Sequence, residues 1–144
     1  MDLPFLTIVV LTYNTCNLVV QCLKNFYKQA VRLGWQVIVV DNGSVDDTAP
    51  IIAKNFPKVE LIRSEQNLGF AGGINLGLRQ ATGQVIVLMN SDVLASAETL
   101  EAAARALLAQ PGVGALSPLL RTPDGEPQPF AFGKDQSPGY LLMR

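Results

Sequence analysis

The sequence predicts an α/β protein with a Rossmann-like, mostly parallel β-sheet and helices on both of its faces. Short apolar runs rich in Val and Ile alternate along the chain with stretches of helical length. These runs are almost continuously apolar, which is typical of parallel strands that are buried on both faces. Four of the runs also lead into polar or glycine-rich residues, and ligands bind at this end of the strands in open α/β sheets.

The first half of the chain is expected to hold three strands and two helices. The strands are predicted at residues 5–11, 36–40 and 59–63. The amphipathic stretch between the first two strands predicts a helix over about residues 15–33. A second helix is predicted at about residues 47–55, with Pro50 in its first turn, where a missing N–H is tolerated.

The second half is expected to continue the same alternation. The predicted elements are a helix at residues 71–81, strands at 84–89 and 113–117, a helix at 96–110, and a turn at 123–125. The helix at 96–110 has the clearest signals, because Ser96 is a good N-cap and Glu98 suits the first turn. Pro111 and Gly112 then end it. The strand at 84–89 is expected to be buried on both faces.

The bulk composition suits one globular domain over residues 1–144. Hydrophobic residues make up 49% of the chain and charged residues 16%, so a folded core is expected. The net charge of −1 argues against a nucleic-acid surface and against a polybasic membrane patch. The chain has no histidine, which excludes a Ser-His-Asp triad, histidine-ligated zinc and a histidine general base. Acid, base or metal chemistry must therefore rely mainly on carboxylates.

The sequence also predicts a cytoplasmic location. No apolar run approaches the roughly 20 residues that a membrane-spanning helix needs, and the first residues lack the basic start of a cleavable signal. Cys16 and Cys22 fall on different faces of one predicted helix, so no disulfide between them is expected and a reducing compartment fits.

Polar residues follow four of the predicted strands. The tips read Thr12-Tyr13-Asn14, Asp41-Asn42-Gly43-Ser44, Asn67-Leu68-Gly69-Phe70-Ala71-Gly72-Gly73 and Asn90-Ser91-Asp92. A single polar tip is ordinary, but parallel strands bring their carboxyl ends to one edge of the sheet. Four such tips at one edge predict a ligand site.

Asp41 follows four apolar strand residues, and a carboxylate at a buried strand end must find hydrogen-bond donors. A nucleobase N–H or a ribose hydroxyl would supply them. The alternative is a structural turn that leads into a helix, which explains Asn42 to Ser44 well and Asp41 less well.

The segment from Asn67 to Gly77 holds four glycines, which allow positive φ and close backbone approach before a helix N-terminus that suits phosphate. It matches neither the dinucleotide fingerprint nor the P-loop. The structural alternative is a tight turn with Gly77 bringing the helix close to the sheet. That alternative accounts less well for Gly69, Gly72 and Gly73 together.

Asp92 is not needed as a helix cap, because Ser96 already supplies one. A carboxylate at a strand tip beside a glycine-rich loop suits Mg²⁺ or Mn²⁺ held by that carboxylate and substrate phosphates. Tyr13 suits either stacking on a base or packing. Arg63 and Arg79 are either solvated or within reach of phosphate.

Together these motifs resemble the glycosyltransferase family 2 domain, which has the GT-A fold, and most closely its rhamnosyltransferase-like bacterial members that build cell-surface polysaccharide. The similarity extends from about Leu3 to Gln128. The matching segments are Val10-Leu11-Thr12-Tyr13-Asn14, Val40-Asp41-Asn42-Gly43-Ser44, Asn67-Leu68-Gly69-Phe70-Ala71-Gly72-Gly73-Ile74-Asn75 and Leu88-Met89-Asn90-Ser91-Asp92-Val93.

The resemblance implies an inverting transferase that binds a nucleotide-diphospho-sugar, such as a UDP- or dTDP-sugar. The acceptor would be a polysaccharide or a lipid-linked glycan. The residues implied to bind the donor are Thr12, Tyr13, Asn14 and Asp41 at the nucleoside, with Asn67, Gly72, Asn75, Asn90 and Asp92. The family's metal-binding Asp-x-Asp motif reads Asn90-Ser91-Asp92 here, so Asp92 is the expected ligand of Mg²⁺ or Mn²⁺.

The sequence departs from the family in its length. Family enzymes continue well beyond this point and carry their catalytic base there, so a truncated or short family member is expected. No catalytic residue is identified, because Asp135, the only acidic residue after Glu126, lacks the family's base motif. The alternative function is a module that binds a nucleotide-sugar without catalysis. A nucleotidyltransferase or a dinucleotide oxidoreductase would need a different loop after the first strand.

Two expectations concern association. The domain is expected to lie peripherally on the inner face of the cytoplasmic membrane, where a lipid-linked acceptor would be. Apolar residues near the end of the chain predict either a homodimer or a disordered tail. These residues are Phe130, Phe132, Tyr140, Leu141 and Leu142.

Overall fold

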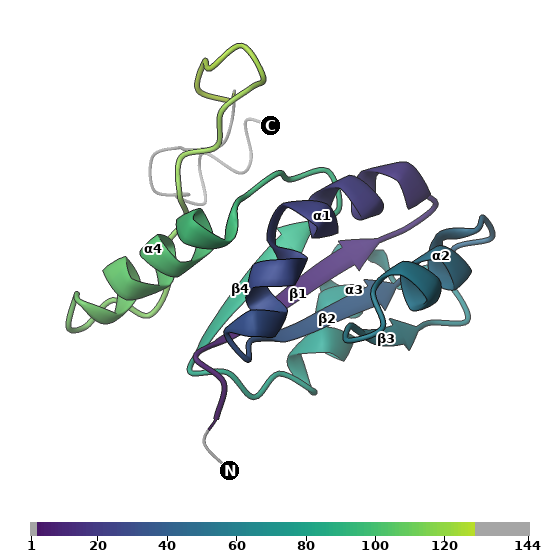
Figure 1. The fold of residues 1–144 in the computed structure, drawn as a ribbon, viewed down its shortest axis with the longest axis horizontal. Helices are drawn as coiled ribbons and strands as arrows, with labels where there is room; N and C mark the ends of the chain where they lie inside the picture. Colours follow the sequence, from purple (N-terminus) through teal and green to yellow (C-terminus); the bar gives the residue numbers. More distant parts are fainter. Residues whose placement is uncertain (1–2, 129–144) are drawn as a thin grey trace, which may run out of the picture. The chain divides into compact units, whose positions relative to one another are not determined.

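The computed structural model describes residues 3–128. Its helices and strands follow the alternation predicted from the sequence (Figure 1). They are β1 (Leu6–Thr12), α1 (Cys16–Arg32), β2 (Gln36–Asp41), α2 (Thr48–Asn55), β3 (Glu60–Arg63), α3 (Gly69–Leu78), β4 (Val85–Asn90) and α4 (Ala97–Leu108). Each lies close to the range expected for it, so the predicted order of strands and helices is confirmed as far as α4.

The four strands form one parallel sheet in the order β3-β2-β1-β4. The register places Thr12 of β1 beside Asp41 of β2, and Asp41 beside Arg63 of β3. On the other side of β1, Leu11 pairs with Asn90 of β4. The polar tips of β1, β2 and β4 therefore meet at one edge of the sheet, as predicted.

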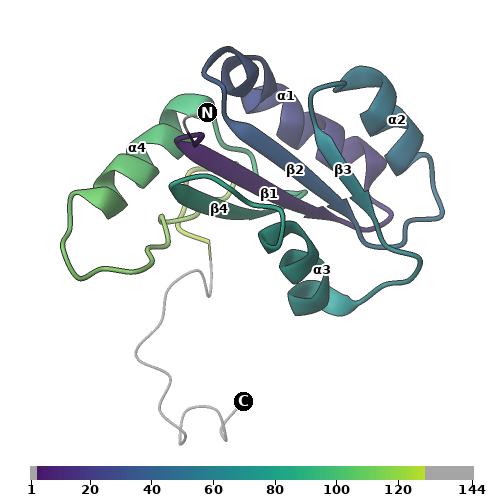
Figure 2. The same cartoon turned by 90° about the horizontal axis from the view of Figure 1, so that it is seen from below.

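Helices cover both faces of the sheet, and each face has its own apolar core (Figure 2). The larger core lies under α1, α2 and α4, and α1 contributes residues spaced three or four apart, which is why it is amphipathic. These residues are Val19, Cys22, Leu23, Phe26 and Ala30. The smaller core lies under α3, where Ile74 packs with Val9, Ile38 and Val40.

The prediction that the strand ending at Asn90 is buried on both faces is wrong. Val85 and Met89 are buried, but Ile86 and Leu88 on the opposite face of β4 are 40% and 47% exposed. The reason is position: β4 is an edge strand of the described sheet, and α3 packs over β1 and β2. An apolar run alone does not distinguish a central strand from an edge strand.

The described residues divide into two compact units, residues 3–109 and residues 110–128. In the described part of the second unit, the turn predicted at residues 123–125 is present, with the Gly125 N–H donating to the Thr122 carbonyl at 2.9 Å. The strand predicted at residues 113–117 is not formed. Val113 is the only β-branched residue of this run, and Gly114 weakens it further.

No helix among residues 3–128 has the length and apolar character to cross a membrane. The apolar residues from Phe130 to Leu142 and Asp135, on which some expectations rest, lie outside the described residues.

Candidate functional site

A pocket of about 240 Å³ opens at the carboxyl edge of the sheet, where the tips of β1 and β4 meet. Four predicted site residues line it, namely Thr12, Tyr13, Asn90 and Asp92. The pocket lining does not include the other predicted site residues, namely Asn14, Asp41, Asn67, Gly72 and Asn75. Five further residues line the pocket but were not predicted as site residues, namely Leu11, Thr15, Leu18, Asn42 and Ser91.

Three hydroxyl groups connect the two sides of this pocket. Thr15 Oγ1 lies 2.8 Å from Thr12 Oγ1 and 2.9 Å from Ser91 Oγ. Thr15 is the N-cap residue of α1, yet its side chain makes no capping hydrogen bond. Its hydroxyl thus fixes the β4 tip against the β1 tip. The signal that could have identified Thr15 is a hydroxyl residue placed directly after a polar strand tip.

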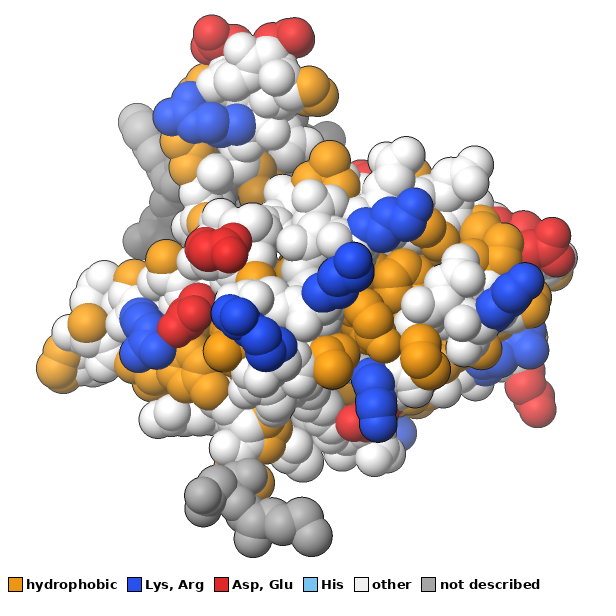
Figure 3. Space-filling model, viewed as in Figure 1, with side chains coloured by type: hydrophobic (Ala, Val, Ile, Leu, Met, Phe, Trp, Pro, Cys, Tyr) orange, Lys and Arg blue, Asp and Glu red, His pale blue; other side chains and the backbone are white. Residues whose placement is uncertain are grey.

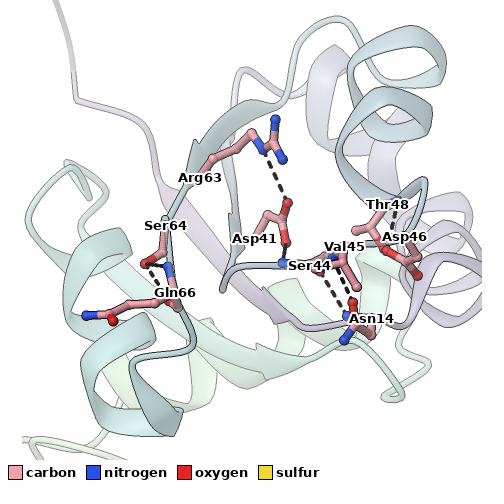
Figure 4. Close-up of polar contacts among 9 residues, drawn as sticks. All are labelled: Asn14, Asp41, Ser44, Val45, Asp46, Thr48, Arg63, Ser64 and Gln66. Atoms are coloured by element: carbon pink, nitrogen blue, oxygen red, sulfur yellow. Dashed lines mark hydrogen bonds and ion pairs between the residues drawn. The ribbon is translucent and has the colours of Figure 1, made fainter.

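Asp41 lies fully buried at the end of β2. Its Oδ1 accepts a hydrogen bond from the Ser44 N–H at 2.9 Å, so the structural-turn interpretation is right for this oxygen. Its Oδ2 is buried and has no hydrogen-bond partner among the described residues. The Arg63 Nε lies 3.4 Å from that oxygen, and Arg63 is otherwise largely exposed (Figure 4). Oδ2 is therefore a buried acceptor that has an ion-pair partner but no hydrogen-bond donor among the described residues.

Asn14 joins the tip of β1 to the loop that follows β2 (Figure 4). Its N–H donates to Ser44 Oγ at 2.9 Å, and its Oδ1 accepts from the Val45 N–H at 2.9 Å. It adopts a positive φ of 51°, which asparagine tolerates better than most residues. Asn14 thus links two loops of the site through its own hydrogen bonds. The predicted contact of Asn14 with the nucleoside stays a prediction.

Asn42 and Asn67 bind each other and the start of α3. The Asn42 amide donates to Asn67 Oδ1 at 3.0 Å and to the Gly69 carbonyl at 3.1 Å. Asn67 Oδ1 also accepts from the Gly69 N–H at 2.8 Å. These bonds hold the glycine-rich segment against the tip of β2. The side-chain oxygen of Asn67, a residue predicted to bind the donor, thus already has two protein donors.

Backbone conformation and close packing explain the glycines of α3 more fully than the sequence suggested. Gly69 begins the helix with a φ of +71°. A Cβ on Gly73 or Gly77 would come within 3.0 Å of side chains on β1, so both let α3 lie close to the sheet. Gly72 has a similar conflict with Leu68 inside its own segment. A purely structural role, in turn geometry and close packing, thus explains Gly77 as expected. Contrary to expectation, it also explains Gly69, Gly72 and Gly73.

Arg79 and Asn75 lie outside the pocket. Arg79 is the C-cap residue of α3, and α3 begins at the carboxyl edge of the sheet, so Arg79 lies toward the opposite edge. This placement favours the solvated interpretation of Arg79. Asn75 is exposed on α3.

Asp92 is the exposed carboxylate of the pocket, and Asn90 beside it is exposed as well. Ser96 caps α4 by accepting the Thr99 N–H at 3.2 Å, which confirms that Asp92 is not the cap. Burial and, to a lesser extent, the charge of Asp92 raise the pKa of Cys22 to about 12. The negative charge of Asp92 thus affects the pKa of a thiol in the second turn of α1.

The donor set at the β4 tip fits a hard divalent cation only in part. No three His, Cys, Asp or Glu side chains cluster as a metal centre within residues 3–128. One carboxylate with an amide and a hydroxyl nearby suits Mg²⁺ or Mn²⁺ when a substrate supplies further oxygen ligands. The arrangement therefore fits a metal that binds together with a phosphorylated ligand.

The chain matches one protein-family model, described as Glycosyl transferase family 2, over residues 7–129. It is 30% identical over 106 residues to N-acetylglucosaminyl-diphospho-decaprenol L-rhamnosyltransferase of Mycobacterium tuberculosis, covering 66% of this chain and 34% of that protein. It is 30% identical over 141 residues to poly(ribitol-phosphate) β-N-acetylglucosaminyltransferase TarS of Staphylococcus aureus, covering 95% of this chain and 24% of that protein.

The chain is also similar to solved structures of glycosyltransferases. The mannosyltransferase PcManGT from Pyrobaculum calidifontis, in complex with GDP-Man and Mn²⁺, has a TM-score of 0.72 at 34% identity. That match covers 86% of this chain and 37% of the other. S. aureus TarS 1–349 with UDP-GlcNAc has a TM-score of 0.62 at 30% identity and covers 72% of this chain and 31% of the other. The chain thus spans less than two-fifths of the length of these relatives.

Proposed function

Because the chain belongs to glycosyltransferase family 2, we propose that its pocket binds the nucleotide-diphospho-sugar donor of a sugar-transfer reaction. The family and the GT-A fold, both predicted from the strand-tip motifs, are confirmed. The observation that carries the proposal is the convergence of Thr12, Tyr13, Asn90 and Asp92 on one pocket at the carboxyl edge of the sheet.

The nucleoside is proposed to lie at the tips of β1 and β2, against Thr12, Tyr13, Asn14 and Asp41. The Asp41 Oδ2 supports this, because it is a buried acceptor that lacks a hydrogen-bond donor among the described residues and would gain from a ligand donor. Asn67, Gly72 and Asn75 are proposed to lie along the sugar-diphosphate side. A UDP- or dTDP-sugar is the proposed donor, and structural relatives were solved with UDP-GlcNAc and with GDP-Man.

Asp92, assisted by Asn90, is proposed to hold Mg²⁺ or Mn²⁺ against the diphosphate. A bound divalent cation would neutralise the charge that builds on the departing diphosphate. The PcManGT complex contains Mn²⁺, which supports the choice of metal. The amide of Asn90 supplies a neutral oxygen where the family's motif has a second carboxylate, so Asp92 carries most of the electrostatic attraction.

Transfer is proposed to proceed with inversion. An acceptor hydroxyl oxygen attacks the anomeric carbon in line, the bond from that carbon to the diphosphate oxygen breaks, and the diphosphate leaves. The hydroxyl proton passes to a base that the described residues do not supply in the pocket, since Asp92 is the only carboxylate lining it. The proposed acceptor is a polysaccharide or a lipid-linked glycan. The mycobacterial relative, named for a diphospho-decaprenol acceptor, supports the second.

The proposed location is the cytoplasm, at the inner face of the membrane. Lys24 and Lys28 are exposed on α1 one turn apart, and Figure 3 shows basic side chains spread among apolar ones on one face of the molecule. Each such side chain contributes about 1 kcal/mol at an anionic surface, so this pair would support only weak, peripheral binding. A homodimer is also proposed, and the exposed Ile86 and Leu88 of β4 support it.

A second candidate function is a module that binds the donor without catalysing transfer. The observation that favours it is the lack of a second carboxylate lining the described pocket. Both candidates predict nucleotide binding, and they differ only in turnover.

Calorimetric titration with UDP, dTDP and GDP, each with and without Mn²⁺, tests the common part of the proposal. Binding of at least one nucleotide, tightened by Mn²⁺, is expected. Failure of all three to bind with or without Mn²⁺ would refute the site. A transfer assay with the matching nucleotide-sugar then separates an enzyme, which releases the nucleoside diphosphate in step with glycosylated acceptor, from a binding module.

A further inference from the structure

Basic side chains gather on α1, on α2 and directly after α2, on one side of the sheet. All of them are exposed, and we call the set the basic face: Lys24, Lys28, Arg32, Lys54 and Lys58. We propose that the basic face docks the protein on an anionic lipid surface. This inference deepens the proposed location at the membrane by naming the surface that docks, and it does not depend on nucleotide binding.

The positions of the lysines along the two helices direct them away from the sheet. With about 3.6 residues per turn, Lys24 and Lys28 fall on the side of α1 opposite to its buried residues. In α2, Thr48 and Ile52 are buried, and Lys54 falls opposite them in the same way. Both helices cover the same face of the sheet (Figure 2), so these three lysines point to the same side of the molecule.

The two helices are fixed to each other below the basic face. The Tyr27 hydroxyl of α1 accepts a hydrogen bond from the Lys58 N–H at 3.0 Å. The Tyr27 ring also packs edge-on against Phe56, the buried residue that ends α2, with 5.1 Å between the ring centroids. The fold therefore sets the spacing between the basic positions of α1 and those of α2 before any partner binds.

The charges of the chain are segregated, although they sum to only −1. No Asp or Glu occurs in residues 16–40 or in residues 48–59, which include α1 and α2. Asp46 and Asp47 precede α2, and Glu60 follows at the start of β3. Figure 3, viewed from the side of α1 and α2, shows basic side chains spread among apolar ones. A clustered positive charge of this kind attracts an anionic surface whatever the net charge of the chain.

Exposed apolar side chains favour lipid over a soluble polyanion as the partner. Val31 and Leu33, on either side of Arg32 at the end of α1, are 41% and 43% exposed. Val31 follows Lys28 by three residues and so shares its side of the helix. Apolar side chains beside basic ones gain by entering the boundary between lipid head groups and acyl chains. A nucleic acid offers phosphates but no such apolar layer.

Docking through the basic face would also bring the pocket to the lipid. α1 begins at the pocket, where Thr15 precedes the helix and Leu18 lies in its first turn, and both line the cavity. With α1 against the lipid surface, the pocket lies where a lipid-linked acceptor would be presented.

Flotation with lipid vesicles measures docking directly. The full chain, without nucleotide, is mixed with vesicles of phosphatidylcholine alone or of phosphatidylcholine and phosphatidylglycerol in equal parts, at low and at high salt. The test variant is Lys24→Gln/Lys28→Gln/Lys54→Gln. The matched control, Arg79→Glu/Gln80→Glu, lowers the net charge by the same amount at the end of α3, on the opposite face of the sheet (Figure 2).

The wild type is expected to bind the vesicles that contain phosphatidylglycerol, to leave phosphatidylcholine unbound, and to be released by high salt, which screens exposed charges. The triple lysine variant should lower the partition coefficient about 100-fold. The control should lower it less than about 3-fold, because its changes lie far from the lipid surface. Val31→Ser should lower it about 5-fold, since a partly inserted apolar side chain is lost.

Equal binding to both kinds of vesicle, or binding to neither, would overturn this inference. So would an equal loss in the triple variant and in the control, because only the net charge would then matter. If Val31→Ser binds vesicles like the wild type and duplex DNA displaces the chain from them, the basic face is a site for soluble polyanions and not for lipid.

Nucleotide binding is measured separately, so that the two proposals fail separately. The three lysines lie outside the pocket lining, so the triple variant should bind UDP and GDP as the wild type does in calorimetry. It should also unfold at the wild-type temperature, because its changed side chains are exposed. A wild type that binds nucleotide but no anionic vesicle loses only the docking surface. A wild type that binds anionic vesicles but no nucleotide loses only the proposed donor site.

Discussion

The hydroxyl oxygens of Thr15 and Ser91 lie 2.9 Å apart, although 76 residues separate them in the sequence. This contact crosses from the start of α1 to the tip of β4, immediately before Asp92. Thr15 also contacts the Thr12 hydroxyl at 2.8 Å, so one side chain connects two strand tips of the pocket. The position of the proposed metal ligand therefore depends on Thr15, which lies outside the predicted metal site.

Replacing Thr15 by valine should destabilise the fold. Valine keeps the shape of the side chain but leaves the Thr12 and Ser91 hydroxyls without this partner, and Ser91 is buried. The expected loss in the free energy of unfolding is about 1–3 kcal/mol, measured by urea denaturation. Thr15→Ser keeps the hydroxyl and should cost less than about 1 kcal/mol. Equal stability of Thr15→Val and Thr15→Ser would show that these hydrogen bonds contribute nothing.

Gly77→Ala tests whether close packing of α3 on the sheet explains the glycines. The added methyl would collide with Val9 and press on Val40. Overpacking of this kind costs about 1–3 kcal/mol, and the better helix propensity of alanine returns about 1 kcal/mol. A net loss in stability is expected. Gly114→Ala is the matched control, because a Cβ there meets nothing within 4 Å. A Gly77→Ala variant more stable than the wild type would contradict the packing explanation.

The strands, and the edge of the sheet at which their polar ends meet, could be predicted because the sequence patterns that mark them are local. Val37 to Val40 and the apolar run before Asn90 mark strands on their own, and parallel pairing then brings Asp41 and Asp92 to one edge. The roles of Thr15 and Arg63 could not be predicted, because each depends on a partner brought close only by folding. The exposure of Leu88 was missed for a related reason: it depends on which strand lies at the edge of the sheet.

The two cysteines should differ in reactivity. Cys22 is fully buried, and its pKa is raised to about 12, mainly by burial. Cys16 is only half-buried, although burial and the charges of Asp46 and Asp47 raise the pKa of its thiol as well. Because the thiolate is the reactive form, an alkylating reagent at pH 8 should label Cys16 slowly and Cys22 only after unfolding. Peptide mapping by mass spectrometry checks this, and rapid labelling of Cys22 in the folded chain would contradict it.

The same thiol predicts how stability changes at high pH. In the unfolded chain Cys22 loses its proton near pH 9, whereas in the folded chain it keeps it to about pH 12. The folded state therefore binds more protons in this window, so this contribution to stability is present below pH 9 and is lost as the pH rises toward 12. Cys22→Ala should reduce the fall in the free energy of unfolding above pH 9. An unchanged fall would assign it to other groups.

Asn90 and Asp41 should affect nucleotide binding in different ways. Asn90→Ala removes a neutral amide beside the metal site and should weaken Mn²⁺-dependent affinity only slightly, by an amount that corresponds to about 1 kcal/mol. Asp41→Ala removes the proposed partner of the nucleoside, so it should weaken binding to a similar degree with and without Mn²⁺. Calorimetry with UDP or GDP separates the two patterns. A loss in Asp41→Ala confined to Mn²⁺-containing buffer would show that Asp41 acts on the metal instead.

The most direct test of the account is the nucleotide affinity of Asp92→Ala, compared with the wild type at zero and at saturating Mn²⁺. Asp92 is the only carboxylate lining the described pocket, so its removal should abolish most of the gain in affinity that Mn²⁺ provides. Loss of a residue that only supports a metal ligand costs about 10- to 100-fold in metal affinity, and loss of the ligand itself should cost at least as much. Without Mn²⁺ the two proteins should bind alike. If Asp92→Ala binds nucleotide as tightly as the wild type in saturating Mn²⁺, the β4 tip is only a turn and the proposed metal site is wrong.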